Sequence, residues 1–279
     1  NDTIVAMDEQ FRLGVIIAAA GASRRFGGRS KLDEDLGGRP VLQRTVEMWV
    51  NRHETARVVV AGPVEPEGAW EEFTLRHADR LTLLGAQLCK GGKTHRYESV
   101  RNALEQMGDD VTHIAVHDGA RPCSSGELLD RVLLAAQKFP AVIPAVELSD
   151  TIKRVGADEV KDEAIDPLAD ILGVGGGDAS GGAGGKNRYR AVEETVNRER
   201  VVAVQTPQVF EVGLLRRAYA QKDLQSTDDA QLVERLGERV VVVEGEVTNV
   251  KITRPSDMKI AMAVLGLKPA AERETHKRF

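Results

Sequence analysis

The sequence predicts an α/β protein built on a doubly wound, mostly parallel sheet. Apolar runs of strand length alternate with helical patterns of about ten to fifteen residues, which is typical of right-handed strand–helix–strand units. The first run, Leu13–Ala20, is uninterrupted and is followed by Gly21, as expected of a strand buried on both faces. Ligands of such sheets bind beyond the carboxyl ends of the strands, so residues at those ends are the candidates for function.

Turn residues and apolar spacing set the expected order of the elements. Pro40 suits a first helical position, and apolar residues with helical spacing follow it as far as Asn51. A strand is expected at 57–61, closed by Gly62 and Pro63. The pattern then predicts a short helix at 70–78, a strand at 81–84, a helix at 97–106, a strand at 113–117, a helix at 126–139 and a strand at 141–146.

A long polar segment interrupts the alternation after Val146. Two strands, 150–155 and 201–205, flank it, and eight of the thirteen residues from Gly173 to Gly185 are glycine. This composition buries too little apolar area to offset backbone entropy, which predicts a mobile loop. Helices at 211–221, 227–236 and 255–265 and strands at 240–244 and 249–253 complete the chain.

We therefore expect one domain over residues 1–279 from which an arm at 150–200 projects. The arm would carry a glycine-rich insertion at about 156–192, and a helix at 163–171 is an option within it. An insertion of this length is unusual for a compact domain.

Charge and composition narrow the functional class. The 279 residues include 38 Lys and Arg against 43 Asp and Glu, so no global basic field would attract a nucleic acid. No apolar run reaches the roughly 18 residues of a membrane span, and residues 1–10 lack the core of a signal peptide. Cys89 and Cys123 lack metal-ligand spacing and indicate reduced thiols. We expect a cytoplasmic protein that binds neither nucleic acid nor membrane.

A turn of small residues, 19–21, follows the first strand and precedes four basic residues. These are Arg24, Arg25, Arg29 and Lys31. Backbone amides in such a turn can approach phosphate oxygens, and the basic side chains can balance the charge of a triphosphate. The turn is neither a dinucleotide fingerprint nor a Walker A loop. A solvated basic loop would have the same composition.

The segment Gly91–Val100 places a glycine turn before a helix start. It is not a P-loop, because Gln87 stands where that motif requires its first glycine. Ser99 would lie in the first helical turn, where it could cap the helix or bind a sugar or phosphate oxygen. An ordinary helix start would show the same pattern.

The strand at 113–117 ends in charged residues. A carboxylate such as Asp118, at the carboxyl end of a strand and beside a phosphate-binding loop, is well placed to hold Mg²⁺. Arg121 can bind a second anion. The alternative is an ion pair between Asp118 and Arg121 that only closes the strand.

Three further blocks complete the pattern, and none is diagnostic alone. They are Asp150–Lys153 with Glu194–Arg198, Gln205–Phe210, and Thr227–Ala230 with Asn249–Thr253. Taken in order, the six blocks resemble the 2-C-methyl-D-erythritol 4-phosphate cytidylyltransferase family of the non-mevalonate isoprenoid pathway, over about Leu13–Leu265. The resemblance implies a Rossmann-like nucleotidyltransferase fold, a homodimer, and Mg²⁺-dependent transfer of CMP from CTP to methylerythritol phosphate with release of pyrophosphate.

The resemblance also assigns roles to residues of this chain. Charge stabilisation in the transition state and positioning of the attacking phosphate fall to Arg25, Lys31, Arg198 and Lys251. Contacts with CTP fall to Ala19, Ala20, Gly21, Gly92, Ser99 and Gly119. The polyol phosphate would contact Asp118, Arg121, Thr151 and Thr206, with Asp118 also beside the metal. In the family the arm reaches the partner subunit, so Thr151 and Arg198 would serve the neighbouring site.

Several positions depart from the family pattern. Ser23 stands at a usual glycine, Ser30 at a usual proline, and the loop is one residue short, which leaves Arg24 as the alternative to Arg25. The stretch 153–198 exceeds the family's by roughly thirty residues. That insertion is either inert, or it covers the partner's site or recruits another protein.

Two other functions share much of this pattern. A cytidylyltransferase for another polyol phosphate, such as ribitol 5-phosphate, would have most of the same motifs. A nucleotide-binding module that has lost catalysis is the alternative from a different class, although the retained Lys31, Asp118, Arg198 and Lys251 argue against it.

Overall fold

The structure is a computed structural model that describes residues 10–21, 23–26, 29–158 and 189–268. The chain forms two units, one comprising residues up to Val146 and from Val204, the other Glu147–Ala203. The elements in chain order are β1 (Leu13–Ala18), η1 (Arg24–Phe26), α1 (Val41–Val50), β2 (Thr55–Gly62), α2 (Ala69–Leu83), β3 (Gln87–Lys90), α3 (Arg96–Leu104), β4 (His113–Asp118), α4 (Gly126–Ala136), β5 (Ala141–Glu147), β6 (Ile152–Val155), β7 (Val192–Val196), β8 (Val202–Val204), β9 (Gln208–Glu211), α6 (Val212–Tyr219), α7 (Asp229–Glu234), β10 (Val241–Glu244) and α8 (Pro255–Val264).

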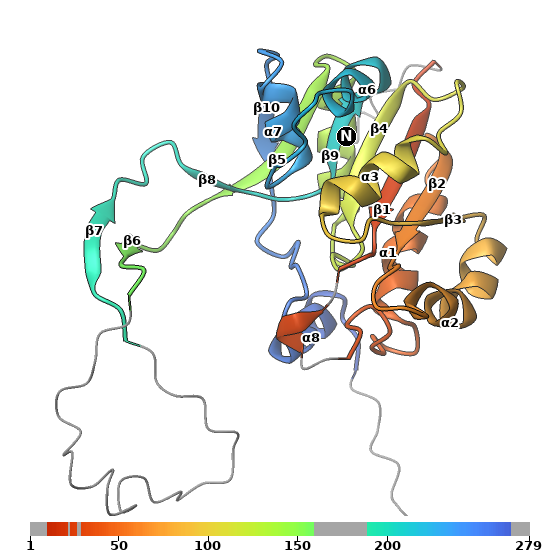
Figure 1. Cartoon of the computed structure of the whole chain (residues 1–279), viewed down its shortest axis with the longest axis horizontal. Helices are drawn as coiled ribbons and strands as arrows, with labels where there is room; N and C mark the ends of the chain where they lie inside the picture. Colours follow the sequence, from red (N-terminus) through yellow and green to blue (C-terminus); the bar gives the residue numbers. More distant parts are fainter. Residues whose placement is uncertain (1–9, 22, 27–28, 159–188, 269–279) are drawn as a thin grey trace, which may run out of the picture. The chain divides into compact units, whose positions relative to one another are not determined.

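The larger unit is built on a sheet in which the strands run in the order β10-β5-β9-β4-β1-β2-β3 (Figure 1). β1 pairs in parallel with β2 on one side and with β4 on the other. The pairs β2–β3 and β10–β5 are also parallel, whereas β9 is antiparallel to both β4 and β5. The predicted doubly wound, mostly parallel sheet is confirmed, and β9 is a strand that the sequence did not predict.

Alternate side chains of β1 enter two different cores. Leu13, Val15 and Ile17 pack with residues of α1, α2, α4 and α8. Ile16 packs on the other side with residues of α3, α6 and α7. Helices therefore cover both faces of the sheet, which explains why the first strand is an unbroken apolar run.

The expected strand at 81–84 is wrong, because residues 81–83 are the last residues of helix α2 and Leu84 is its C-cap. Leu81 is buried, Leu83 is 89% exposed, and the Leu84 amide donates to the Arg80 carbonyl as in a helix. Gly85, with φ of 86°, ends the helix in the left-handed conformation that glycine adopts without strain. The strand follows as β3.

The expected strand at 249–253 is also wrong. Its alternating pattern belongs to a loop whose backbone is held by isolated contacts: the Ile252 amide donates to the Ala120 carbonyl, and the Asn249 side chain donates to the Thr206 carbonyl. Ile252 is fully buried, so the pattern correctly indicated which side chain faces the core, although no strand pairs there.

The smaller unit contains an antiparallel ladder between β6 and β7, from Ile152 opposite Val196 to Val155 opposite Val192. The sequence predicts β6 and β8, but not β7. The segment 163–171, where a helix was an alternative, and the glycine-rich run 173–185 lie outside the described residues.

Gly91 lies where three segments at the edge of the sheet meet, and its substitution tests this packing. A Cβ at Gly91 would lie 2.6 Å from the Gly62 carbonyl oxygen, 2.8 Å from Ser99 Oγ and 2.9 Å from Ala20 Cβ. We expect Gly91→Ala to lower the free energy of unfolding by about 1–3 kcal/mol, because a packed backbone must shift. Urea denaturation measures the change.

Gly126→Ala is the matched control. A Cβ at Gly126, in the first turn of α4, would meet nothing within 4 Å. Alanine is favoured over glycine in helices, so this variant should be as stable as the wild type or slightly more stable. Equal losses at the two positions would contradict the packing argument.

Candidate active site

A cavity of about 670 Å³ opens at the carboxyl ends of the parallel strands β1, β2 and β4. Its wall is formed by Ala18–Gly21, Ser23, Arg25, Lys31, Leu32, Glu65, Pro66, Gly92–Arg96, Ser99, Asp118–Ala120, Lys251 and Thr253. The chain adds β2 and β3 on one side of β1 and β4 on the other, so the cavity lies where the winding direction of the sheet changes. Doubly wound sheets bind their ligands at this position.

The loop after β1 presents backbone with little side chain. Residues 19–21 are small, and Ser23 follows with φ of 48°, in the left-handed region that favours glycine. The Lys31 amide donates to Ser23 Oγ over 3.3 Å, so the serine side chain closes the loop that ends at Lys31. A second hydrogen bond fixes another part of the cavity wall, where the Gly92 amide donates to Ser99 Oγ over 2.9 Å.

Positive charge predominates in the described wall of the cavity. The five cationic side chains are Arg25, Lys31, Lys93, Arg96 and Lys251. The two carboxylates are Glu65 and Asp118. Burial lowers the pKa of Lys31, and repulsion from Lys251 and Arg25 lowers it further. A bound polyanion would relieve this repulsion, so the wall is suited to a triphosphate.

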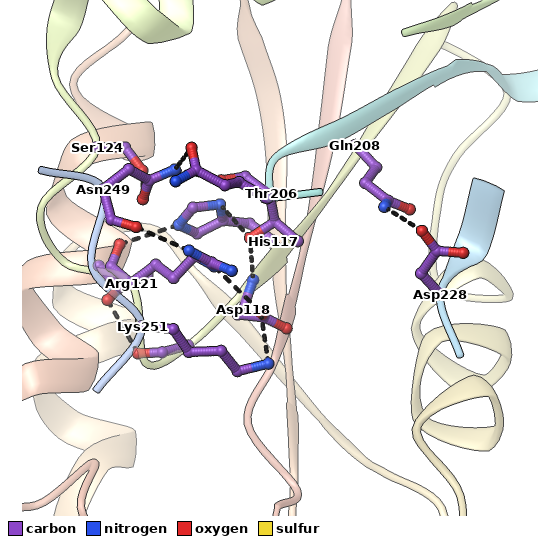
Figure 2. Close-up of polar contacts among 12 residues, drawn as sticks. His117, Asp118, Arg121, Ser124, Thr206, Gln208, Asp228, Asn249 and Lys251 are labelled. Atoms are coloured by element: carbon purple, nitrogen blue, oxygen red, sulfur yellow. Dashed lines mark hydrogen bonds and ion pairs between the residues drawn. The ribbon is translucent and has the colours of Figure 1, made fainter. Parts of the chain in front are cut away.

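Asp118, the last residue of β4, is the point on which the cations converge (Figure 2). Its carboxylate lies 2.8 Å from Lys251 Nζ, 3.3 Å from Arg121 Nε and 3.4 Å from Arg96 Nε. Burial by itself would raise the pKa of Asp118, but Arg96, Lys251 and Arg121 hold that pKa well below its usual range. The carboxylate is therefore ionised and orients three cations.

Thr206 and His117 hold the end of β4 behind this cluster. The Asp118 amide donates to Thr206 Oγ1 over 3.1 Å, and His117 Nε2 lies 3.1 Å from the Arg121 carbonyl oxygen. Because a carbonyl can only accept, Nε2 carries the hydrogen, and Nδ1 accepts from the Thr206 hydroxyl over 3.2 Å. Burial lowers the pKa of His117 to about 4, so the ring is neutral at pH 7.

Asn249 anchors the segment that carries Lys251. Its amide donates to the Thr206 carbonyl over 2.9 Å, and its Oδ1 accepts from Ser124 Oγ over 3.0 Å. Its backbone carbonyl accepts from Arg121 Nη1 over 2.7 Å. Lys251 is therefore attached, two residues away, to the same framework that holds Asp118 (Figure 2).

The structure brings most of the predicted site residues to the cavity wall. These are Ala19, Ala20, Gly21, Arg25, Lys31, Gly92, Ser99, Asp118, Gly119 and Lys251. Arg121 and Thr206 are not among the wall residues and contact Asp118 from behind. The side chain of Arg24 lies outside the described residues.

Two predicted residues, Thr151 and Arg198, belong to the smaller unit. Thr151 is exposed, and the Arg198 guanidinium donates to the carbonyls of Leu148 and Ser149 within that unit.

Sequence reasoning missed Arg96, Lys93, Glu65 and Thr253, which also line the cavity. For Arg96 a signal existed. It is the first residue of α3, and a cation is unfavourable at the N-terminus of a helix unless an acidic group compensates it. An arginine at such a position therefore indicates an ion pair. The sequence offers Glu98 two residues later, but in the structure Glu98 accepts from the Thr94 and His95 amides, and Arg96 pairs with distant carboxylates.

The described helices include none that is both long enough and apolar enough to cross a membrane.

The burial of neutral His117 predicts a pH-dependent stability. An unfolded chain protonates histidine near the ordinary pKa of 6.5, whereas native His117 does so near 4. Between these values the unfolded state binds a proton that the native state does not, so the free energy of unfolding falls as the pH falls from 6.5 to about 4. We expect His117→Gln to flatten this part of the profile, as measured by urea denaturation at a series of pH values. Parallel profiles for variant and wild type would contradict the assignment.

Comparison with known proteins identifies the family. The family model described as IspD, 2-C-methyl-D-erythritol 4-phosphate cytidylyltransferase, matches residues 13–167 and 184–267. A protein of this name from Frankia casuarinae is 38% identical over 91% of this chain and 81% of its own length, and one from Bacillus mycoides is 34% identical over 90% and 96%. The crystal structure of the enzyme of this name from Thermus thermophilus aligns with a TM-score of 0.63 at 32% identity, covering 92% of this chain and all of the other. The chain therefore belongs to the 2-C-methyl-D-erythritol 4-phosphate cytidylyltransferase family.

Proposed function

We propose that this chain transfers CMP from CTP to 2-C-methyl-D-erythritol 4-phosphate, forming 4-diphosphocytidyl-2-C-methyl-D-erythritol and pyrophosphate for isoprenoid precursor synthesis. Membership of the family supports the reaction. The structural observation that carries it is the concentration of cations around Asp118, at the wall of a cavity where a doubly wound sheet binds its ligands.

The reaction depends on neutralising negative charge more than on transferring a proton. A phosphate oxygen of the acceptor forms a bond to the α-phosphorus of CTP, while the bond from this phosphorus to the bridging oxygen breaks and pyrophosphate leaves with the electron pair. The attacking phosphate is already anionic, so no strong general base is needed. The chain has to align two anions and neutralise the charge that accumulates between them.

The residues on the cavity wall suit these tasks. Arg25 and Lys31 neutralise the triphosphate, and the small residues 19–21 let backbone amides approach it. Gly92, Ser99 and Gly119 contact the nucleotide. Lys251 is directed by Asp118 toward the acceptor phosphate, while Arg121 and Thr206 keep Asp118 in place.

We assign Thr151 and Arg198 to the binding of the acceptor in the partner's site of a homodimer. The smaller unit supports an interface, because it exposes apolar side chains that a partner could cover, namely Tyr189, Val192, Val201 and Val202. Sedimentation velocity tests this assembly, and a monomer at micromolar concentration would contradict it.

Mg²⁺ is the proposed cofactor, and Asp118 is its protein ligand. The described residues contain no group of three or more His, Cys, Asp or Glu side chains that could hold a metal unaided. An ionised carboxylate on a wall suited to a triphosphate fits the usual mode of Mg²⁺, which is bound through one or two carboxylates together with substrate phosphates. When bound, the ion would neutralise part of the charge of the triphosphate.

A cytoplasmic location is proposed from the two free cysteines.

Pyrophosphate release tests the function directly. We expect rapid release with CTP, Mg²⁺ and 2-C-methyl-D-erythritol 4-phosphate, and slow release when ATP, GTP or UTP replaces CTP. Release only with ribitol 5-phosphate would keep the chemistry and change the acceptor. Absence of release with every pair would contradict the proposed activity.

Substitution of the cationic wall residues tests the mechanism. Removing one group that stabilises charge in the transition state typically lowers kcat by about 10²–10³-fold, and we expect this of Lys31→Ala and of Lys251→Ala. Steady-state kinetics at saturating CTP and acceptor gives the values. The matched control is Lys259→Ala, which removes an exposed lysine of α8 that does not line the cavity. Near-normal kcat in either wall variant would remove that residue from the mechanism.

A further inference from the structure

Asp229, in the first turn of α7, is a buried charge outside the machinery proposed above. Its side chain is 1% exposed, although α7 begins near the surface with half-buried or exposed residues on either side of Asp229 and Ala230. A buried carboxylate is costly unless cations or donors satisfy it. The Thr227–Ala230 block therefore contains a residue whose burial requires an explanation.

Both oxygens of Asp229 have a partner. Oδ2 lies 2.5 Å from Arg96 Nη1, and Oδ1 accepts from the Tyr219 hydroxyl over 2.5 Å. Burial and the charge of Asp229 raise the pKa of Tyr219, so the hydroxyl remains protonated and donates. Asp229 is thus held between α6 and the start of α3.

The backbone at Asp229 is also fixed. Gln208 Oε1 accepts from the amides of Asp229 and Ala230 over 3.2 and 3.1 Å, and Gln208 Nε2 donates to Asp228 over 2.8 Å (Figure 2). Gln208 belongs to β9, inside the sheet. The start of α7 therefore cannot move without disturbing a central strand.

Arg96 connects this buried pair to the cavity. Its Nε lies 3.4 Å from Asp118 Oδ1, while its Nη1 contacts Asp229, so one guanidinium bridges two carboxylates. Only Asp118 lines the cavity; Asp229 does not. Lys251 and Arg121 compete with Arg96 for Asp118. Without Asp229, the carboxylate of Asp118 would be the remaining partner of Arg96. Arg96 would then pair with Asp118 more closely and compete with Lys251 for it.

We propose that Asp229 is a positioning residue that holds Arg96 at the cavity wall as a triphosphate-binding cation and leaves Asp118 to direct Lys251. The inference rests on the proposed function, because it assumes that CTP occupies this cavity. A planar guanidinium can satisfy two carboxylates at once, whereas a lysine ammonium is a point charge. The arrangement therefore requires arginine at this position.

Asp229→Asn tests the positioning role. Asparagine can still accept from Tyr219, but its NH₂ group would face the Arg96 guanidinium. The loss of one charge-assisted hydrogen bond lowers an equilibrium constant by roughly 10- to 100-fold. We therefore expect KM for CTP to rise by this factor, with a smaller change in kcat. Calorimetry with CTP should show the same loss of affinity, which makes the result independent of the acceptor.

Glu234→Gln is the matched control. It also removes a carboxylate charge from α7, but Glu234 is exposed at the far end of the helix and does not line the cavity. Kinetics and CTP affinity of this variant should match the wild type.

A double-mutant cycle separates positioning from structure. If Asp229 acts through Arg96, Asp229→Asn should add little to the loss in KM already caused by Arg96→Met. If Asp229→Asn does not fold, Arg96→Lys replaces it in the test, because lysine cannot bridge Asp118 and Asp229 and should raise KM for CTP similarly.

The outcomes are distinguishable. Wild-type affinity for CTP in folded Asp229→Asn, or full additivity with Arg96→Met, would overturn the positioning role while the activity stands. A wild-type chain that neither binds CTP nor releases pyrophosphate would overturn the proposed function and this inference together. A wild-type chain that binds CTP but turns over no acceptor would overturn only the function, and the affinities of the variants would still decide the role of Asp229.

Discussion

The charge of Asp118 is the constraint on which the site depends. A carboxylate at the buried end of a strand remains ionised only if cations reach it. Here one is local, Arg121 from the turn after β4, and two come from distant parts of the chain, Arg96 from α3 and Lys251 from the loop before α8. Each of these segments is therefore tied to the same point. Because Asp118, with Asp229 behind Arg96, supplies two negative charges against the three cations, the cluster retains excess positive charge, and this excess makes the cavity a site for phosphates.

The sequence could predict the cavity wall because the wall is made of strand ends. Parallel strands end at a common edge, so apolar runs followed by Gly21 or by Asp118 place those residues together whatever the details of packing. The sequence could not predict which residues face the cavity and which stand behind it. Thr206 lies behind Asp118 because it leads into β9, a four-residue antiparallel strand whose pairing with β4 has no local signal.

At the two wrongly predicted strands, tertiary contacts override the local sequence pattern. Residues 81–84 are apolar enough for a strand, but hydrogen bonding continues from α2 until Gly85 ends the helix. Residues 249–253 alternate as a strand does, yet Asn249 satisfies its polar groups with side-chain contacts across the larger unit. In both cases the burial of individual apolar residues follows the sequence pattern, while the hydrogen-bond partner is determined by segments far away in the chain.

The position of β9 has a consequence for synthesis of the chain. The described strands that pair with β5 all lie beyond residue 201. A ribosome adds roughly 5–20 residues per second, so β5 spends about 3 seconds or more without these partners while residues 148–201 are made. An exposed apolar edge is an aggregation hazard during that interval. Pro144, in the middle of β5, has no amide hydrogen to donate to a strand of another chain. The proline therefore disfavours pairing of the nascent strand with other chains.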